Sequence, residues 1–117
     1  MTDTRGEPYL PSWALVVLND AIVADGMAEL RWELHDLLLS GVRNVVVDVS
    51  RIEDMSSTIL ATLLSTHRAC RARGGKVTIR NPNPRALDLL RHTGLHRVFD
   101  LDTSGSAIGH RSAHRAP

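Results

Sequence analysis

A valine-rich segment, residues 42–49, limits the possible folds most strongly. Five of its eight residues are valine, and Gly41 and Ser50 bound it. β-Branched side chains favour extended backbone, and a short apolar run of this kind is typical of a strand that is buried on both faces. Such a strand needs helices packed against its sheet. The segment therefore predicts the central strand of a helix-covered sheet.

Three neighbouring segments predict helices. Apolar residues recur three and four positions apart in residues 25–40, and we expect Asp25 to cap the start of this helix. The same spacing recurs in residues 56–73, which precede two glycines typical of a helix end. Pro84 suits the first position of a third helix that continues over residues 85–92. Helices thus separate the extended segments along the chain.

Four further segments predict strands. Two of them, residues 13–18 and 76–80, are short and rich in β-branched side chains. After a turn, residues 21–24 continue segment 13–18 as a second strand. Residues 98–101 form a closing edge strand. The alternation of strands and helices favours parallel pairing through right-handed crossovers. The predicted fold class is a single α/β domain, with about four to five strands in a mostly parallel or mixed sheet and about three to four helices.

We expect the domain to cover residues 13–102, after an N-terminal extension at 1–12 and before a disordered tail at 103–117 that lacks a core pattern. No apolar run approaches the roughly 20 residues that cross a bilayer, and residues 1–11 hold no apolar signal core. Cys70 is the single cysteine, so no intrachain disulfide can form. These features predict a cytoplasmic protein without a membrane partner.

The charges are balanced in total but not along the chain. Residues 1–64 carry four Arg against ten acidic residues, a net of −6, and residues 65–117 carry ten Lys and Arg against three acidic residues, a net of +7. This asymmetry suits either docking to a charged partner or solvated faces of opposite sign. Aromatic residues amount to 3%, too few to stack bases, and the basic segment 76–80 predicts a strand rather than a helix-turn-helix turn. We therefore expect no nucleic acid partner.

The chain lacks the motifs that usually carry catalysis. No serine has the flanking glycines of a nucleophile elbow, and no glycine-rich phosphate loop precedes a helix. We therefore predict no enzyme activity, no catalytic residue, no cofactor and no metal. We interpret the isolated reactive side chains as solvated or packing residues: Glu53, Asp54, His67, Cys70, His92, His96, His110 and His114.

Three hydroxyl side chains stand at the start of the second predicted helix. Ser56, Ser57 and Thr58 precede its apolar positions. Free backbone N–H groups and the helix dipole favour an added anion there, so the cluster suits phosphorylation. A helix N-cap needs one hydroxyl and explains the same pattern. From the residues alone, both interpretations stay open.

Five blocks follow one another in a characteristic order. They are residues 47–50 (VDVS), 67–75 (HRACRARGG), 77–82 (VTIRNP), 86–95 (ALDLLRHTGL) and 97–99 (RVF). Together with the hydroxyl-rich helix start, and over residues 13–101, they resemble the STAS domain, the family of bacterial anti-sigma factor antagonists. The resemblance implies a non-enzymatic α/β module that regulates transcription by binding other proteins.

Members of that family carry Asp-Ser-Ser-Gly at this helix start, and the first serine is the phosphoacceptor. Ungapped alignments that start from the block before this helix start and from the block after it give the same result. They place Ser56 at the aspartate, Ser57 at the phosphoacceptor, Thr58 at the second serine and Ile59 at the glycine. The resemblance therefore implies Ser57 as the phosphoacceptor, with Ser56 and Thr58 as alternatives. It also implies a partner-binding face made of Asp54, Ser56, Ser57, Thr58 and Ile59, in which we expect Ile59 to be the exposed apolar centre.

The resemblance implies an anti-sigma factor or serine kinase as the partner, with a serine phosphatase and other STAS proteins as further partners. Docking would free a sigma factor, and phosphorylation would switch the docking. A second reading is a STAS scaffold within a multi-protein signalling assembly, where the hydroxyl cluster is only a cap. A third reading, a module for a small ligand or nucleotide, has no phosphate loop to support it.

Overall fold

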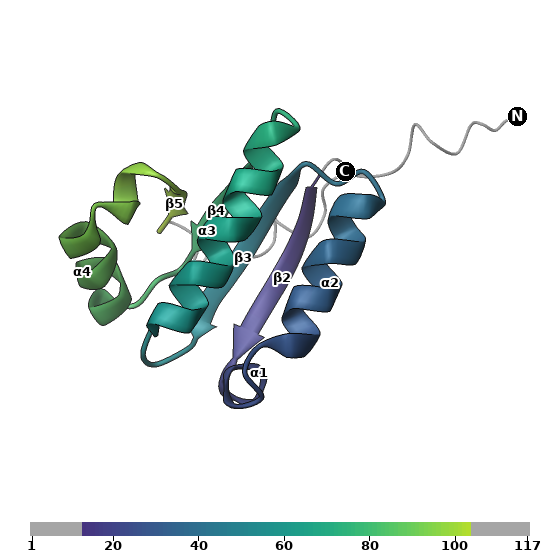
Figure 1. Cartoon of the computed structure of the whole chain (residues 1–117). Helices are drawn as coiled ribbons and strands as arrows, with labels where there is room; N and C mark the ends of the chain where they lie inside the picture. The colour runs from purple at the N-terminus through teal and green to yellow at the C-terminus, as the bar shows by residue number, and fades with distance from the viewer. Residues whose placement is uncertain (1–12, 104–117) are drawn as a thin grey trace, which may run out of the picture.

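The computed structural model describes residues 13–103, which form one four-stranded sheet. Its strands are β2 (Trp13–Asn19), β3 (Asn44–Arg51), β4 (Lys76–Arg80) and β5 (Asp100–Asp102). They lie side by side in this order, and each neighbouring pair is parallel (Figure 1). The predicted α/β domain with a parallel sheet is confirmed.

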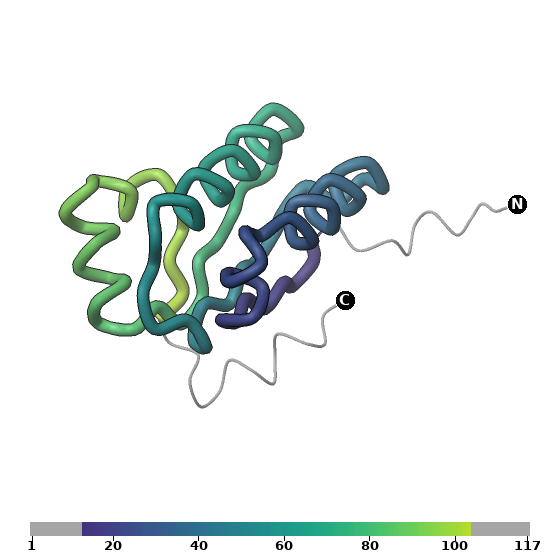
Figure 2. Tube along the Cα trace, turned by 60° about the horizontal axis from the view of Figure 1, so that its bottom comes forward, coloured from purple at the N-terminus to yellow at the C-terminus, as the bar shows by residue number. Residues whose placement is uncertain are grey.

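The helices are α1 (Asp20–Ala24), α2 (Ala28–Leu39), α3 (Ser57–Ala72), α4 (Pro84–Thr93) and the short 3-10 helix η2 (Leu95–Arg97). Strand order follows chain order, so right-handed crossovers carry the connecting helices to one face of the sheet. Figures 1 and 2 show α2 and α3 side by side on that face, with α4 at the β5 end. None of the helices in residues 13–103 is long and apolar enough to span a membrane.

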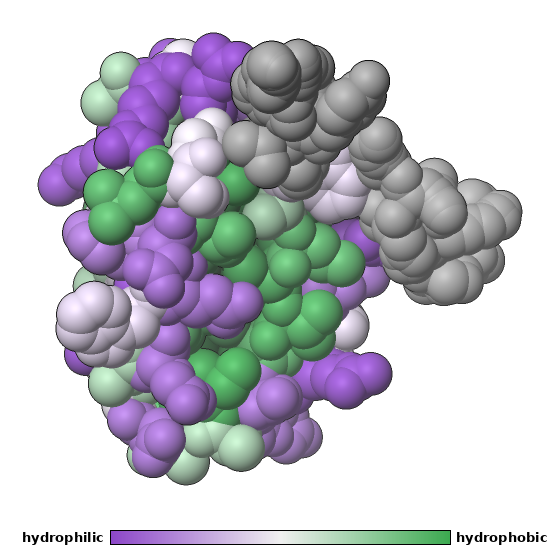
Figure 3. All heavy atoms as spheres, turned by 90° about the vertical axis from the view of Figure 1, so that its right-hand side faces the viewer, coloured by the Kyte–Doolittle hydropathy of each residue, from purple (hydrophilic) through white to green (hydrophobic). Residues whose placement is uncertain are grey.

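Within residues 13–103, helices therefore cover one face of the sheet and leave the other without a helix. In β3, the side chains of Val45, Val47 and Val49 are buried, whereas those of Val46 and Asp48 are half-buried. The prediction of a strand buried on both faces is wrong, because every crossover between the described strands turns to the same side. Figure 3 shows hydrophobic side chains gathered on the side of the molecule that β2 and α2 form.

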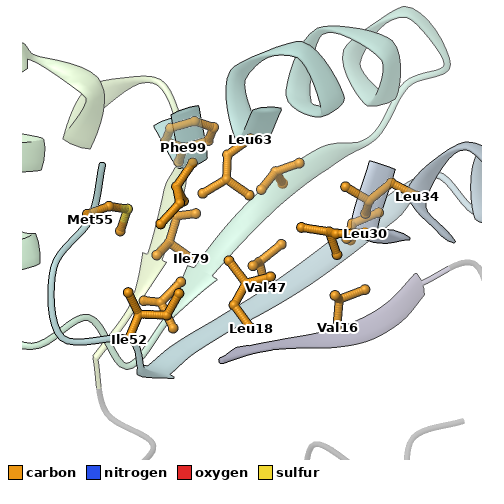
Figure 4. Close-up of a cluster of buried hydrophobic side chains, with 14 of the residues drawn as sticks. Val16, Leu18, Leu30, Leu34, Val47, Ile52, Met55, Leu63, Ile79 and Phe99 are labelled. Atoms are coloured by element: carbon orange, nitrogen blue, oxygen red, sulfur yellow. The ribbon is translucent and has the colours of Figure 1, made fainter. Parts of the chain in front are cut away.

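The core lies between the sheet and its helix layer (Figure 4). Side chains from β2, β3 and β4 meet those from α2 and α3 there, and Phe99 closes the β5 end. The labelled members are Val16, Leu18, Leu30, Leu34, Val47, Ile52, Met55, Leu63, Ile79 and Phe99. The loop residues Ile52 and Met55 thus fasten the β3–α3 connection to the core.

The segment after β2 is helical, so the predicted second strand at residues 21–24 is wrong. Asn19 ends β2 in an extended conformation, and its side-chain oxygen accepts a hydrogen bond from the N–H of Ile22 at 2.9 Å. This bond caps a helix that the β-branched side chains alone do not favour. Asp25 is the C-cap of α1 rather than the N-cap of the following helix.

The following helix begins at Ala28, three residues later than predicted. Gly26 and Met27 both have a positive φ, 75° and 65°, which turns the chain between the two helices. A left-handed backbone is unusual for methionine. The Met27 side chain is fully buried, so core packing stabilises that conformation.

The C-terminal half agrees more closely with the sequence. Strand β4 covers the predicted residues 76–80, Pro84 is the first residue of α4, and Gly94 ends that helix with a φ of 78°. The closing strand is shorter than predicted, because η2 and residues 98–99 precede it and β5 covers 100–102. The predicted extension at 1–12 and all of the predicted tail after Thr103 lie outside the described residues.

Candidate functional site

The hydroxyl cluster lies at the start of α3, and its three members have different roles. Ser56 is the N-cap, because its Oγ accepts a hydrogen bond from the N–H of Ile59 at 3.2 Å. Ser57 is the first residue of the helix, and Thr58 follows it. All three residues are exposed. The cap therefore occupies Ser56 and leaves the Ser57 and Thr58 side chains facing solvent.

Ile59 is not part of this surface. Its side chain is 0% exposed and belongs to the hydrophobic core. The expectation that Ile59 forms an exposed apolar docking centre is wrong, because helical spacing places it on the same face of α3 as Leu63, His67 and Cys70, which are also buried. That spacing is visible in the sequence.

The loop before α3 is tied to the start of α4 by one asparagine. The side-chain amide of Asn83 donates to the carbonyl oxygens of Ile52 and Glu53 at 3.2 and 3.0 Å. Its side-chain oxygen accepts from the N–H of Ala86 at 2.8 Å and so caps α4. This residue escaped the sequence analysis, although an Asn-Pro pair before a helix is a usable signal for a cap.

Asp54 lies in the same loop and is exposed. Its carboxylate forms an ion pair with Arg85 of α4 at 3.0 Å. Both side chains remain largely in solvent, so the pair contributes little to stability. It does place an arginine beside the start of α3, which the sequence analysis also missed. The structure thus brings Asp54, Ser56, Ser57 and Thr58 to one exposed edge, without Ile59.

A shallow hollow of about 250 Å³ lies beside this loop. Its lining comes from the carboxyl ends of β2 and β3 and from the α4 cap: Asp20, Ser50, Arg51, Ile52, Glu53 and Asn83. Ligand pockets are usually larger, about 300–1,000 Å³, and in open α/β sheets they form where the strand order reverses. The order of the described strands does not reverse. The geometry at this edge therefore does not support the small-ligand reading.

The other reactive side chains are placed away from this edge. Within residues 13–103, no group of three or more His, Cys, Asp or Glu is arranged to hold a metal ion. His92 Nδ1 lies 3.0 Å from the carbonyl oxygen of Asp88, one turn earlier in its own helix. Burial raises the pKa of the Cys70 thiol, against an opposing effect of Arg73, so the thiolate is disfavoured. His110 and His114 lie outside the described residues.

His67 is a packing residue that joins α3 to the sheet. Its Nδ1 accepts a hydrogen bond from the N–H of Val77 in β4 at 3.1 Å. The ring also meets Phe99 edge-to-face, with ring centres 5.4 Å apart. Burial lowers the pKa of His67, the charge of Arg71 lowers it further, and Asp100 opposes both. The neutral imidazole is the form that this hydrogen bond requires.

Three cations of the basic C-terminal half meet acidic residues within the fold. Lys76 pairs with Asp100, Arg85 pairs with Asp54, and the buried Arg80 lies 4.0 Å from a carboxylate oxygen of Asp48. Two of these acidic residues, Asp48 and Asp54, belong to the acidic half of the chain. Part of the charge asymmetry along the chain is therefore neutralised in the folded molecule.

Comparisons with known proteins agree with this architecture. The crystal structure of a candidate anti-sigma factor antagonist from Thermotoga maritima, TM1081, is similar with a TM-score of 0.68 at 15% identity, over 87% of this chain and 88% of that one. The NMR structure of TM1081 gives 0.69 at 19% identity, over 88% and 86%. At these identities the likeness shows the fold.

A search of curated protein sequences finds no match. A family model described as "Mlab, STAS domain" matches residues 12–103, which is most of the chain and includes every described strand and helix. The resemblance drawn from the sequence blocks is thereby confirmed. The chain belongs to the STAS domain family.

Proposed function

We propose that this STAS domain is a regulatory module of the anti-sigma factor antagonist type, which acts by binding proteins and not by catalysis. Its partner is an anti-sigma factor or serine kinase in the cytoplasm, and it docks at the exposed edge that carries Asp54, Ser57 and Thr58. The observation that carries the proposal is the position of Ser57, which is exposed at the first turn of α3 while Ser56 performs the capping.

This position makes Ser57 the best candidate for a phosphorylation switch. A phosphate there adds about −1.5 to −2 charges at a helix N-terminus, where backbone N–H groups and the helix dipole stabilise an anion. The free domain therefore keeps its fold. In the complex the phosphate meets the partner surface and must lose water, so docking weakens through bulk and charge. A serine phosphatase reverses the switch.

The experiment is to incubate the full chain with ATP and the anti-sigma-type serine kinases of its native cell, and to locate added phosphate by mass spectrometry. Modification of Ser57 supports the switch, and modification confined to Ser56 or Thr58 contradicts the assignment of the phosphoacceptor. In pull-downs, Ser57→Asp is expected to retain its fold and lose the kinase, whereas Ser57→Ala retains both. Equal recovery of the kinase with both variants contradicts docking at this edge.

The Ser56 cap favours a second candidate, a STAS scaffold that is never phosphorylated. In that function the hydroxyl cluster serves helix α3 alone, and the partners are other STAS proteins in a signalling assembly. The pull-down separates the two functions, because a scaffold recovers STAS proteins without a kinase. It also recovers them equally well with Ser57→Asp and with Ser57→Ala.

A further inference from the structure

Helix α2 presents an outer surface that none of the residues 13–103 covers. Trp32 is 69% exposed and Leu39 is 67% exposed, and Ala28 is exposed on the same face one turn before Trp32. At about 100° per residue, these three side chains form one ridge along the helix. Trp is enriched among the residues that dominate protein interfaces. We call Ala28, Trp32 and Leu39 the α2 ridge.

Charged side chains flank this ridge with opposite signs. Arg31 and His35, one turn apart, line a groove of about 260 Å³ between α2 and α3, together with Leu38 and the α3 residues Thr62, Ser65, Thr66 and Ala69. Glu29, Glu33 and Asp36 follow at the same helical spacing on the other flank, away from α3. All five charged or titratable residues of the two flanks are exposed. The helix therefore carries a basic stripe, an apolar ridge and an acidic stripe in parallel.

We infer that the α2 ridge is the contact surface for a second copy of this chain, related by a two-fold axis parallel to the helix. In a parallel helix pair, the left flank of one helix faces the right flank of the other. The acidic stripe of each copy then lies along the basic stripe of its partner, on both sides of the paired ridges. An antiparallel pair places like stripes together and is opposed by charge. The charge pattern thus selects one closed, self-complementary arrangement.

The dimer contact along α2 buries a small area, which limits the affinity of the dimer. Helix α2 has 12 residues and is about 18 Å long, so the paired ridges bury less than a standard protein interface. We expect a weak dimer whose formation depends on concentration and salt. The Trp32 ring also meets His35 edge-to-face, with ring centres 6.2 Å apart, so the ridge is in contact with the basic stripe beside it.

Sedimentation equilibrium of the full chain over a wide concentration range tests this inference. The wild-type chain is expected to dimerise, and added salt weakens the dimer. Trp32→Ala raises the dissociation constant at least about tenfold. Val98→Ala, at an exposed hydrophobic residue outside α2, is the matched control and leaves the constant unchanged. A chain that stays monomeric at every concentration, or a dimer that Trp32→Ala does not weaken, overturns the inference.

A charge-reversal pair tests the orientation. One variant carries Arg31→Glu, and the other carries both Glu29→Lys and Glu33→Lys. Each variant alone places like charges on both sides of the paired ridges and is expected to lose the dimer. A mixture of the two variants restores opposite charges on both sides of the paired ridges and forms a heterodimer. Antiparallel pairing would instead leave the Arg31→Glu homodimer no weaker than the wild type and would be strengthened by salt. Ser57→Asp separates this surface from the proposed docking edge, because it is expected to leave the dimer intact.

Discussion

Helices α2 and α3 lie side by side on one face of the sheet, yet they meet the core differently (Figure 2). Helix α3 buries six of its 16 residues and begins with a side-chain cap from Ser56. Helix α2 buries two of its 12 residues, begins at a left-handed methionine without a side-chain cap, and exposes Trp32 and Leu39. Helix α3 is therefore a rigid support for the candidate docking edge, whereas α2 keeps apolar surface available for a partner.

The strongest test of this comparison is a charge placed on each helix. Ile59→Arg buries an unpaired cation in the core and is expected to lower the free energy of unfolding by more than about 4 kcal/mol. Trp32→Arg, on the exposed ridge, changes it by no more than about 0.5 kcal/mol. Thermal unfolding followed by circular dichroism measures both. If Ile59→Arg unfolds like the wild type, α3 is not anchored as described.

Removing the His67 ring tests how α3 is joined to β4 and β5. His67→Ala leaves the buried N–H of Val77 without its acceptor and removes the Phe99 contact, which costs about 1–3 kcal/mol for the unpaired donor alone. Urea unfolding at pH 7.5 measures the loss. His35→Ala, an exposed histidine on α2, is the control and is expected to unfold like the wild type.

The same histidine makes stability depend on pH. Because the pKa of His67 is lowered in the folded state, the unfolded chain takes up a proton first as the pH falls below 6.5. The contribution of neutral His67 is therefore complete above pH 6.5 and is lost as the pH falls through the folded pKa. The difference in unfolding free energy between wild type and His67→Ala should shrink from pH 7.5 to pH 5. A constant difference contradicts a buried neutral imidazole.

Removing the N-cap of α3 is expected to lower the free energy of unfolding by a smaller amount. Ser56→Ala removes the hydrogen bond to the N–H of Ile59 and is expected to cost about 1 kcal/mol of stability. Ser57→Ala, one position later, costs less than about 0.5 kcal/mol, because its hydroxyl is not the cap. Chemical denaturation of both variants measures the contrast. An equal loss for the two serines means that the capping role is shared.

The smallest effect is expected at the exposed ion pair beside the docking edge. Asp54→Ala removes the partner of Arg85 and changes the unfolding free energy by no more than about 0.5 kcal/mol. Asn83→Ala, which releases the same loop and also removes the α4 cap, costs about 1 kcal/mol or more. Denaturation of the two variants shows whether the loop is held by the asparagine or by the ion pair.

The elements with a strong local signal were predictable. Segment 42–49 was identified as a strand from its valines, and α4 from Pro84 at its start and Gly94 at its end. The hydroxyl cluster was placed at a helix start, where it lies. These features depend on backbone preferences of a few neighbouring residues, so no knowledge of the fold was needed.

The two main failures have different causes. Residues 21–24 have β-branched side chains, but Asn19 caps them into a helix, and buried Met27 holds the turn that follows. Ile59 was assigned to the surface from its position in a family motif, although its spacing from Leu63 and His67 predicts burial. The first failure is due to packing of Met27 and to the Asn19 cap, whereas the burial of Ile59 is readable from the spacing within its own helix.

The alternation of strands and helices, the family and the position of the exposed hydroxyls all follow from the amino-acid sequence. Three features emerge only from the folded chain: the helices cover one face of the sheet, Asn83 ties the loop before α3 to the start of α4, and α2 exposes its tryptophan between stripes of opposite charge. The reason is physical. Local preferences act between residues a few positions apart, whereas burial and pairing arise between segments that meet only when the chain has folded.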